Sequence, residues 1–302
     1  MTELQRLIQN RRKKNGVAGK TSSGTPIYIK VKSQAGGRKR DIMKTPVIME
    51  KVNTAINENA SIELCKGEIP GTRAMHHILT EGSKLVFSAN AGYYHIVVLI
   101  TGEADFATDG QTYTFNERVT FVPALDKDLV IDAKTKVNVL EVQWDCAAED
   151  EALIEEYKTV FPYMQLYKDS IQYTDPNKSE KTISRMTIPH RVIPRFAIGS
   201  VETYGVDLVK SHAHPMLDQF FFSFPENDMF VMINGEPILM EGDILMHIPL
   251  GADHGVEIPE GKHCHYMWID FYPDNDEALK RLDSSHIDTG KHVEFNEKGE
   301  RK

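Results

Sequence analysis

The chain has 302 residues, of which 41% are hydrophobic, and these values suit two folded domains of ordinary size. Its formal net charge of -9 argues against general affinity for nucleic acid, because phosphate binding needs a basic face. The charge is uneven, since residues 1–45 hold twelve Lys and Arg residues against two acidic ones. We interpret this basic N-terminal arm as a segment that wraps the protein's own body or a partner subunit, rather than a contact for nucleic acid or membrane.

Three cysteines, Cys65, Cys146 and Cys264, lie far apart and are odd in number, so no disulfide framework is implied. The first residues contain no apolar stretch of the signal-peptide kind, and the run from Ile96 to Ile100 is far too short to span a bilayer. We therefore expect a cytoplasmic protein without membrane contact.

Within the arm, residues 2–12 suit a short amphipathic helix, and Thr25–Val31 alternates like a strand. From residue 46 to 147 the segments are short and strand-like, and turn signals such as Thr101-Gly102 and Asp109-Gly110 separate them. Many short strands without a long helix between them predict an all-β sandwich or barrel.

A helix is predicted over residues 149–160, where acidic residues at the start favour the helix dipole. Residues 148–190 are interpreted as this helix followed by a polar, irregular connection. A second strand-rich block covers residues 191–275. Residues 276–302 form a short helix up to Leu282 and a polar tail from residue 287 that we expect to be poorly ordered.

The two strand-rich blocks repeat each other. His95 aligns with Gln219 at an offset of 124 residues, and Pro123 aligns with Pro249 at an offset of 126. The offset grows only at positions that read as turns, and the helices that follow the two blocks also align. A tandem duplication explains this regularity better than chance.

The second block contains the chemistry. His212 and His214 are two residues apart on a predicted strand, so their side chains share one face. His254 arrives on a strand about forty residues later. Three histidines in this arrangement are typical of a metal site.

These residues, together with Gly242 and Pro249-Leu-Gly251, resemble the motif order of the cupin superfamily over roughly residues 60–275. The resemblance implies two tandem cupin barrels, each a double-stranded β-helix or jelly roll, in a bicupin. It also implies one divalent transition metal on His212, His214 and His254, with Zn, Fe, Mn and Ni all open.

The chain departs from the family pattern at the fourth ligand. Gln219 stands where the family has Glu, and its amide oxygen is a weaker, neutral donor. Asp218 is adjacent, but on a strand it should face the opposite side, so Gln219 is favoured and Asp218 is the reserve.

The equivalent positions of the first block are Ser88, Asn90, His95 and Asp128. They offer too few metal ligands, so we expect the first barrel to be metal-free and structural.

Strand parity predicts which other side chains face the metal. Lys210 should share the inward face with His212, and Phe221 and Ser223 should share it with Gln219. A buried Lys210 would need an anion, such as a substrate carboxylate or phosphate, unless an irregular strand releases it to solvent. Trp268 is either part of this substrate pocket or a core residue.

Two further groups of histidines leave alternatives open. His247 is either a second pocket group that moves a proton or a core residue with one bonded nitrogen. His263 and His265 resemble a metal cluster, but at a strand start we expect them to be exposed.

The function predicted first is that of a metal-dependent isomerase or lyase acting on a small oxygen-rich acid or sugar derivative, with Lys210 and His247 as catalytic residues. An iron-dependent dioxygenase and a non-catalytic metal- or ligand-binding sensor are the alternatives, because the fold alone does not choose a reaction. We expect a homodimer with a small-molecule substrate.

Overall fold

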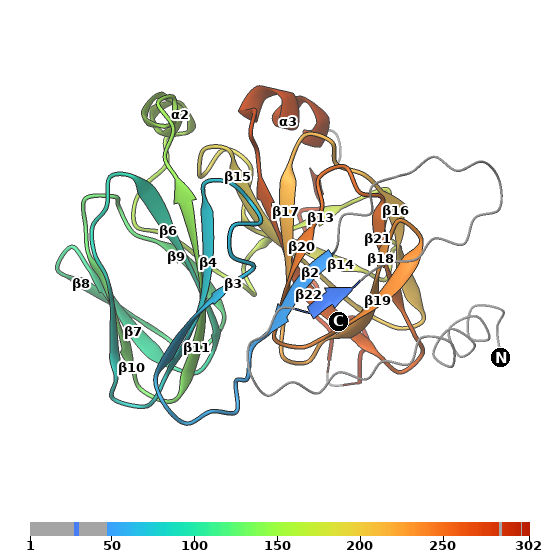
Figure 1. Ribbon diagram of the computed structural model, residues 1–302, viewed down its shortest axis with the longest axis horizontal. Coiled ribbons are helices and arrows are strands. Elements are labelled where there is room, and N and C mark those ends of the chain that lie inside the picture. The colour runs from blue at the N-terminus through green and yellow to red at the C-terminus, as the bar shows by residue number, and fades with distance from the viewer. Residues whose placement is uncertain (1–26, 30–46, 284–285, 297) are drawn as a thin grey trace.

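The computed structural model describes residues 27–29, 47–283, 286–296 and 298–302. The predictions for the basic arm, residues 1–45, lie outside the described residues except at β1 (Ile27–Ile29). Two barrels of antiparallel strands lie side by side, and the helices α2 and α3 lie at the same end of the molecule (Figure 1). The all-β fold with two tandem barrels is confirmed.

The first barrel is built from a six-stranded sheet, in the order β12-β9-β6-β11-β4-β3, and a four-stranded sheet, in the order β5-β10-β7-β8. Its strands are Ala60–Leu64 (β3), Thr72–Leu79 (β4), Lys84–Phe87 (β5), Tyr93–Thr101 (β6), Ala104–Thr108 (β7), Gln111–Phe115 (β8), Val119–Val122 (β9), Leu129–Ala133 (β10), Val137–Asp145 (β11) and Tyr163–Leu166 (β12). Alternate apolar residues of both sheets, such as Phe106 and Phe121, fill the barrel interior.

The second barrel has a nine-stranded sheet, in the order β1-β2-β20-β17-β22-β15-β14-β13-β23, and a four-stranded sheet, in the order β16-β21-β18-β19. Its strands are Val47–Lys51 (β2), Ile171–Thr174 (β13), Ile183–Ile188 (β14), Phe196–Tyr204 (β15), Asp207–His212 (β16), Asp218–Ser223 (β17), Asp228–Ile233 (β18), Glu236–Glu241 (β19), Ile244–Ile248 (β20), His254–Ile258 (β21), His263–Phe271 (β22) and Ile287–Asp288 (β23).

Each barrel is followed by one short helix, α2 (Asp150–Tyr157) and α3 (Asn275–Leu282). The side chain of Asp274 caps α3 by accepting a hydrogen bond from the backbone N–H of Glu277 at 2.9 Å. Both helices occur where the acidic starts of the segments predict them. Within the described part of the chain, neither helix has the length and hydropathy of a membrane span.

One strand crosses between the barrels. β2, which precedes the first barrel, hydrogen-bonds to β20 of the second barrel, whereas β12, which follows the first barrel, bonds to β9 of that same barrel. β9 and β20 are equivalent strands of the repeat, so each barrel adds a flanking strand at the same edge. Residues 47–51, assigned from the sequence to the first barrel, therefore complete the sheet of the second.

The prediction that residues 163–190 are an irregular connection is wrong, because they contribute β12, β13 and β14. These strands contain polar residues, so the sequence pattern does not predict them. In the structure Arg185 of β14 is buried and paired with Glu202 at 2.8 Å, which removes the cost of its charge. The tail predicted to be poorly ordered also contributes β23, which pairs with β13.

A separate apolar cluster lies between the two barrels. Ile96 and Val98 of the first barrel pack with Phe220, Phe222 and Ile269 of the second in one continuous set of buried contacts. The larger sheets of the two barrels thus share a core, which fixes the second barrel and its cavity against the first.

Candidate metal centre

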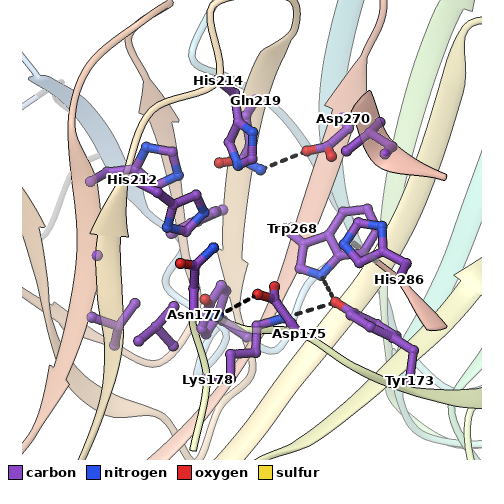
Figure 2. Close-up of a pocket in the computed structure, with 17 residues that line it drawn as sticks. Tyr173, Asp175, Asn177, Lys178, His212, His214, Gln219, Trp268, Asp270 and His286 are labelled. Carbon is purple, nitrogen blue, oxygen red and sulfur yellow. Dashed lines mark hydrogen bonds and ion pairs between the residues drawn. The ribbon is translucent and has the colours of Figure 1, made fainter. Parts of the chain in front are cut away.

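A cavity of about 60 Å³ opens within the second barrel, and its walls are both apolar and polar. It is lined by Tyr173, Asp175, Asn177, Lys178, Val209, His212, His214, Gln219, Phe221, His254, Gly255, Val256, Tyr266, Trp268, Asp270, Leu282 and His286. Figure 2 shows His212 and His214 on one side of the cavity and Tyr173, Trp268 and His286 on the other. A few convergent polar groups in a partly apolar cavity are the usual composition of a ligand site.

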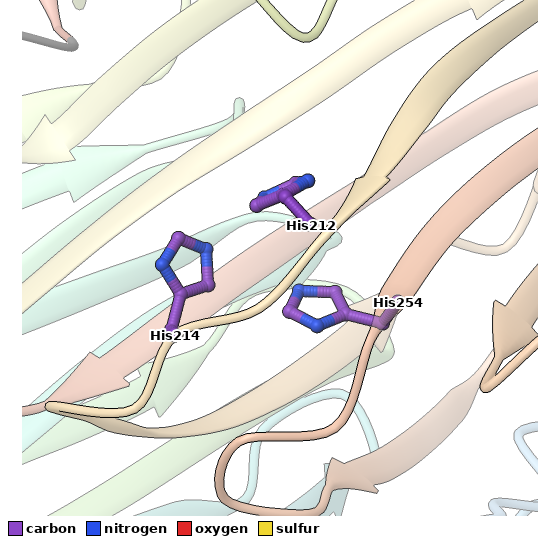
Figure 3. Close-up of side chains that lie close together, drawn as sticks. All are labelled: His212, His214 and His254. Carbon is purple, nitrogen blue, oxygen red and sulfur yellow. The ribbon is translucent and has the colours of Figure 1, made fainter.

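The structure brings the three predicted histidines together (Figure 3). One ring nitrogen from each of His212, His214 and His254 lies within 4.8 Å of the others. The β-ladder explains this, since His212 of β16 lies directly opposite His254 of β21, and His214 follows β16 by two residues. A single ion can touch three nitrogens at this spacing.

Backbone carbonyls orient two of the rings. His212 Nδ1 lies 2.8 Å from the carbonyl oxygen of Lys210, and His254 Nδ1 lies 3.0 Å from that of Ala252. A carbonyl oxygen only accepts, so each Nδ1 carries a proton and each Nε2 keeps its lone pair. This is the arrangement that metal-binding histidines usually have.

Two of the histidines are also held neutral. Burial, together with the neighbouring rings of His254 and His212, lowers the pKa of His214 to about 3. Burial lowers the pKa of His254 to about 4. At neutral pH both rings are therefore uncharged, which is the form that ligates a metal.

Gln219 lies in the cavity beside these rings. Its Nε2 donates to Asp270 Oδ1 at 2.6 Å, directly across the ladder between β17 and β22. Its Oε1 is buried without a hydrogen-bond partner among the described residues. A buried acceptor with no donor is costly, and a cation held by the three histidines would satisfy it. The residues therefore fit a divalent metal.

The wall opposite the histidines was not identified from the sequence. Lys178 is buried there, paired with Asp175 at 3.2 Å, and it donates to Tyr173 Oη at 2.9 Å (Figure 2). Tyr173 and Asp175 come from β13 and the turn after it, in the segment interpreted as a connection. The i,i+3 spacing of Asp175 and Lys178 was the available signal, but such pairs are common on exposed turns.

The C-terminal segment adds another missed residue. His286 lines the cavity, and its ring stacks on Trp268 with centroids 5.5 Å apart. Its Nδ1 lies 2.9 Å from His190 Nε2, and His190 Nδ1 lies 2.9 Å from the hydroxyl of Tyr272. Burial lowers the pKa of His286 to about 3, so the ring is neutral. A neutral imidazole can donate or accept a proton at the cavity wall.

The prediction that Lys210 faces the cavity is wrong. A β-bulge between Val209 and His212 shifts the alternation of β16, so Val209 points inward and Lys210 is exposed. Leu208, two residues before Lys210, is likewise 42% exposed. The irregular strand that the sequence left as the alternative is the observed one.

His247 is buried but does not line the cavity. It lies opposite Phe220 in the ladder and therefore faces the shared core instead of the side of Gln219. Its Nδ1 lies 3.1 Å from Glu68 of the first barrel, and its Nε2 has no partner among the described residues. The catalytic role predicted for His247 is inconsistent with this position.

Of the remaining residues predicted to line the pocket, two do so and one does not. Phe221 and Trp268 line the cavity, whereas Ser223 does not. Ser223 lies two residues beyond Phe221, where its hydroxyl donates to the carbonyl oxygen of Glu241 at 2.6 Å. Its hydroxyl also accepts a hydrogen bond from the backbone N–H of Ile244 at 3.0 Å, so the side chain is used within the barrel wall.

A second group, Glu202, His263 and His265, also brings ligand atoms within 4.8 Å of one another. His265 is buried, which contradicts the prediction that it is exposed. Glu202 is paired with Arg185 at 2.8 Å, and Arg118 Nη1 lies 3.4 Å from His265. Two guanidinium groups already supply the positive charge here, so this group is less suited to a metal than the three histidines.

The corresponding region of the first barrel forms an internal network. Glu141 accepts hydrogen bonds from His95 at 2.6 Å and from His77 at 3.0 Å. Of the other residues compared with the metal site, Asp128 accepts from the backbone of Ala89 and Asn90 from that of Gly92. These side chains bind one another and the backbone, which is a structural role.

Comparison with solved structures identifies the fold. The chain is similar to a cupin 2 conserved barrel domain protein from Leptotrichia buccalis (TM-score 0.50, 12% identity, 71% of this chain and 89% of that chain). It is also similar to protein Ylba from E. coli (TM-score 0.59, 7% identity, 74% and 90%) and to procruciferin, an 11S globulin from Brassica napus (TM-score 0.54, 7% identity, 72% and 81%).

No protein-family model matches the chain, and a search of curated proteins found no significant match. Sequence identities this low show the fold alone. The chain therefore has the cupin fold, repeated as two barrels in one polypeptide, and it carries a histidine group that could hold a metal in the second barrel.

Proposed function

We propose that the protein is a metal-dependent enzyme whose single centre is the cavity of the second barrel. One divalent transition metal would be held by His212, His214 and His254, with Gln219 Oε1 as a fourth donor. The observation that carries this proposal is the convergence of three ring nitrogens, two of them with fixed tautomers, beside a buried amide oxygen that lacks a donor.

A small anionic substrate suits the cavity best. The cavity volume is about 60 Å³. One water needs roughly 10–15 Å³ on the same measure, so the cavity suits a molecule of a few heavy atoms. Lys178, with 7% of its side chain exposed, offers a cation to a carboxylate. We therefore favour a small oxygen-rich acid, with Lys178 in the role that the sequence suggested for Lys210.

An isomerase or lyase reaction is the favoured chemistry. A bound metal would polarise a carbonyl or hydroxyl oxygen of the substrate. Tyr173, His286 and Asp270 are protonatable groups on the cavity wall, and burial raises the pKa of Asp270 to about 7. Groups of this kind serve proton transfer, which isomerases and lyases require.

An iron-dependent dioxygenase is the second candidate, because the four proposed donors are all neutral and no carboxylate is among them. Oxygen uptake by the iron-loaded protein, measured with small acids, separates the two. Iron together with oxygen uptake would replace the isomerase or lyase by the dioxygenase. Complete absence of metal binding would leave only a non-catalytic, ligand-binding role.

The first test is metal content. We expect the purified protein to take up about one equivalent of divalent metal, measured by mass spectrometry of the elements and by titration with Co(II). His212→Ala and His254→Ala should each lose stoichiometric uptake, because each removes one of three converging ligands. His292→Ala, at an exposed histidine, is the matched control and should bind normally. A full equivalent in both cavity variants would show that the site lies elsewhere.

A further inference from the structure

Tyr173 has an unusual position in the cavity wall. It lies on β13, only 4% exposed, and Figure 2 shows its hydroxyl group between Lys178 and Trp268. Lys178 Nζ donates to Tyr173 Oη at 2.9 Å, and Trp268 Nε1 donates to the same oxygen at 3.0 Å. Two separate elements of the barrel thus point N–H groups at one phenol oxygen.

Neither of these partners can accept a proton. An ammonium group and an indole N–H are donors only, so the hydroxyl proton of Tyr173 must point away from both. None of the residues that the structure describes accepts it. The phenol therefore keeps one hydrogen bond to give, and Tyr173 is one of the residues that line the cavity.

The two donors are themselves fixed. Lys178 is held by Asp175, whose Oδ1 in turn accepts from the backbone N–H of Asn177 at 2.8 Å. Trp268 is stacked on the ring of His286, with an angle of 8° between the planes. The phenol oxygen is thereby held in place before any ligand arrives, which is what proton transfer to a bound molecule requires.

We infer that Tyr173 is the proton donor of this cavity and acts on an oxygen atom of a small anionic substrate bound beside the three histidines. The inference rests on the proposed function. In the transfer, the O–H bond of Tyr173 breaks as a new O–H bond forms on the substrate oxygen, and one negative charge moves from that oxygen to the phenolate. The ammonium of Lys178 and the N–H of Trp268 stabilise the phenolate.

The ionisation state agrees with a donor. Burial raises the pKa of Tyr173, while Lys178 and the hydrogen bond from Trp268 lower it and Asp175 raises it. The net shift is upward, so the phenol is protonated at neutral pH and is an acid in the resting protein. His286, whose ring centroid lies 4.5 Å from that of Tyr173, is neutral and does not change this balance.

The experiment uses the intact protein loaded with Co(II), with oxalate and malonate as small dianionic probes. Their binding is followed by the visible absorption of Co(II). Tyr173→Phe removes only the hydroxyl group and should weaken binding of the tighter probe by about 10- to 100-fold, the usual effect of losing a hydrogen bond to a charged group. Tyr266→Phe is the matched control, because Tyr266 lines the same cavity and, among the described residues, no Lys or Trp donates to its hydroxyl.

A spectroscopic measurement separates hydrogen-bond donation from a packing role. In the Zn(II)-loaded protein with ¹³Cζ-labelled tyrosine, one of the resonances from 11 tyrosines should vanish in Tyr173→Phe. In the native protein that resonance should shift downfield when the dianion binds, as the phenol donates to it. In Trp268→Phe, which keeps an aromatic ring but removes the N–H, the resonance should already differ before ligand is added.

The outcomes are distinct. Failure to take up Co(II) contradicts the proposed function. Three results contradict the role of Tyr173 when Co(II) uptake is normal. They are unchanged probe affinity in Tyr173→Phe, a tyrosine resonance that does not move, and no binding of either dianion by the native protein. Unchanged Co(II) affinity and unfolding temperature in Tyr173→Phe, with weakened probe binding and the shifted resonance, support it.

Discussion

Glu141 shows at the scale of one residue how the first barrel satisfies a buried charge with its own side chains. It is 2% exposed and accepts hydrogen bonds from His77, His95 and the side chain of Gln143. Burial raises the pKa of Glu141, but the three hydrogen bonds outweigh burial and lower it to about 2. A buried carboxylate satisfied in this way stabilises the barrel instead of binding a substrate.

The pH dependence of stability follows from that pKa. The folded value of about 2 lies below the ordinary value of 4.5, so the stabilisation is complete above pH 4.5 and is lost as the pH falls towards 2. Glu141→Gln should lower the free energy of unfolding at pH 7 by about 3 kcal/mol, and the difference from the native protein should shrink at pH 3. Urea unfolding at pH 7, 5 and 3 measures it.

The exposed Glu81→Gln provides the comparison for this measurement and should change little at any pH. A difference between Glu141→Gln and the native protein that stays constant from pH 7 to pH 3 would disagree with the assigned ionisation.

The sequence identified the three histidines and Gln219 but not Lys178 on the opposite wall of the cavity. The histidines follow a strand motif of fixed spacing, and spacing is visible in a sequence. Lys178 lies in a polar segment between strands, where most lysines are solvated, and only the contact with Asp175 and Tyr173 distinguishes it. Lys210 was chosen in its place because strand parity ignores a bulge.

At the scale of elements, the junction of α2 with the second barrel depends on one arginine. Arg195, just before β15, donates to both carboxylate oxygens of Asp150 at 2.9 Å. It also donates to the backbone carbonyl of Asp145 at 2.7 Å, and its guanidinium lies 4.6 Å from the ring centre of Trp144. This pair joins the end of the first barrel to the second, with little exposure to solvent.

Removing one partner of this buried pair should strongly lower the stability of the protein. Arg195→Met keeps the length of the side chain but leaves Asp150 buried and unpaired, so we expect a loss of about 3–5 kcal/mol in the free energy of unfolding. Arg191→Met is the matched control, since Arg191 makes a similar bidentate pair with Asp283 at an exposed site and should lose at most about 1 kcal/mol.

Chemical denaturation of both variants provides the comparison. The double variant of Arg195→Met with Asp150→Asn should recover part of the loss, because no charge is then left buried. Equal effects of Arg195→Met and Arg191→Met would show that burial of the Arg195 pair contributes nothing.

At the scale of the whole molecule, we expect the two barrels to unfold as one unit. The apolar cluster between them contains residues of both larger sheets, and β2, which precedes the first barrel, adds hydrogen bonds to β20 of the second. Unfolding of one barrel would expose the apolar face of its neighbour, which is a cost that couples their stabilities.

The two tryptophans test this coupling directly, since Trp144 belongs to the first barrel and Trp268 to the second. The variants Trp268→Phe and Trp144→Phe each leave one fluorescent reporter. Within each variant, we expect the fluorescence of the remaining tryptophan and the circular dichroism to give the same transition midpoint, because one barrel should not unfold without the other. Fluorescence and circular dichroism midpoints that separate within either variant would indicate independent barrels.

The sequence by itself determined the repeat, the all-β fold and the three histidines, because these depend on periodicity and spacing along the chain. The tertiary structure alone decided which strands complete each barrel, which lysine reaches the cavity and where His247 points. Those outcomes depend on a bulge in β16, on the pairing of β2 with the second barrel and on contacts between residues far apart in sequence, such as Trp268 and Tyr173. Local pattern cannot specify them, since each is fixed by the packing of a partner element.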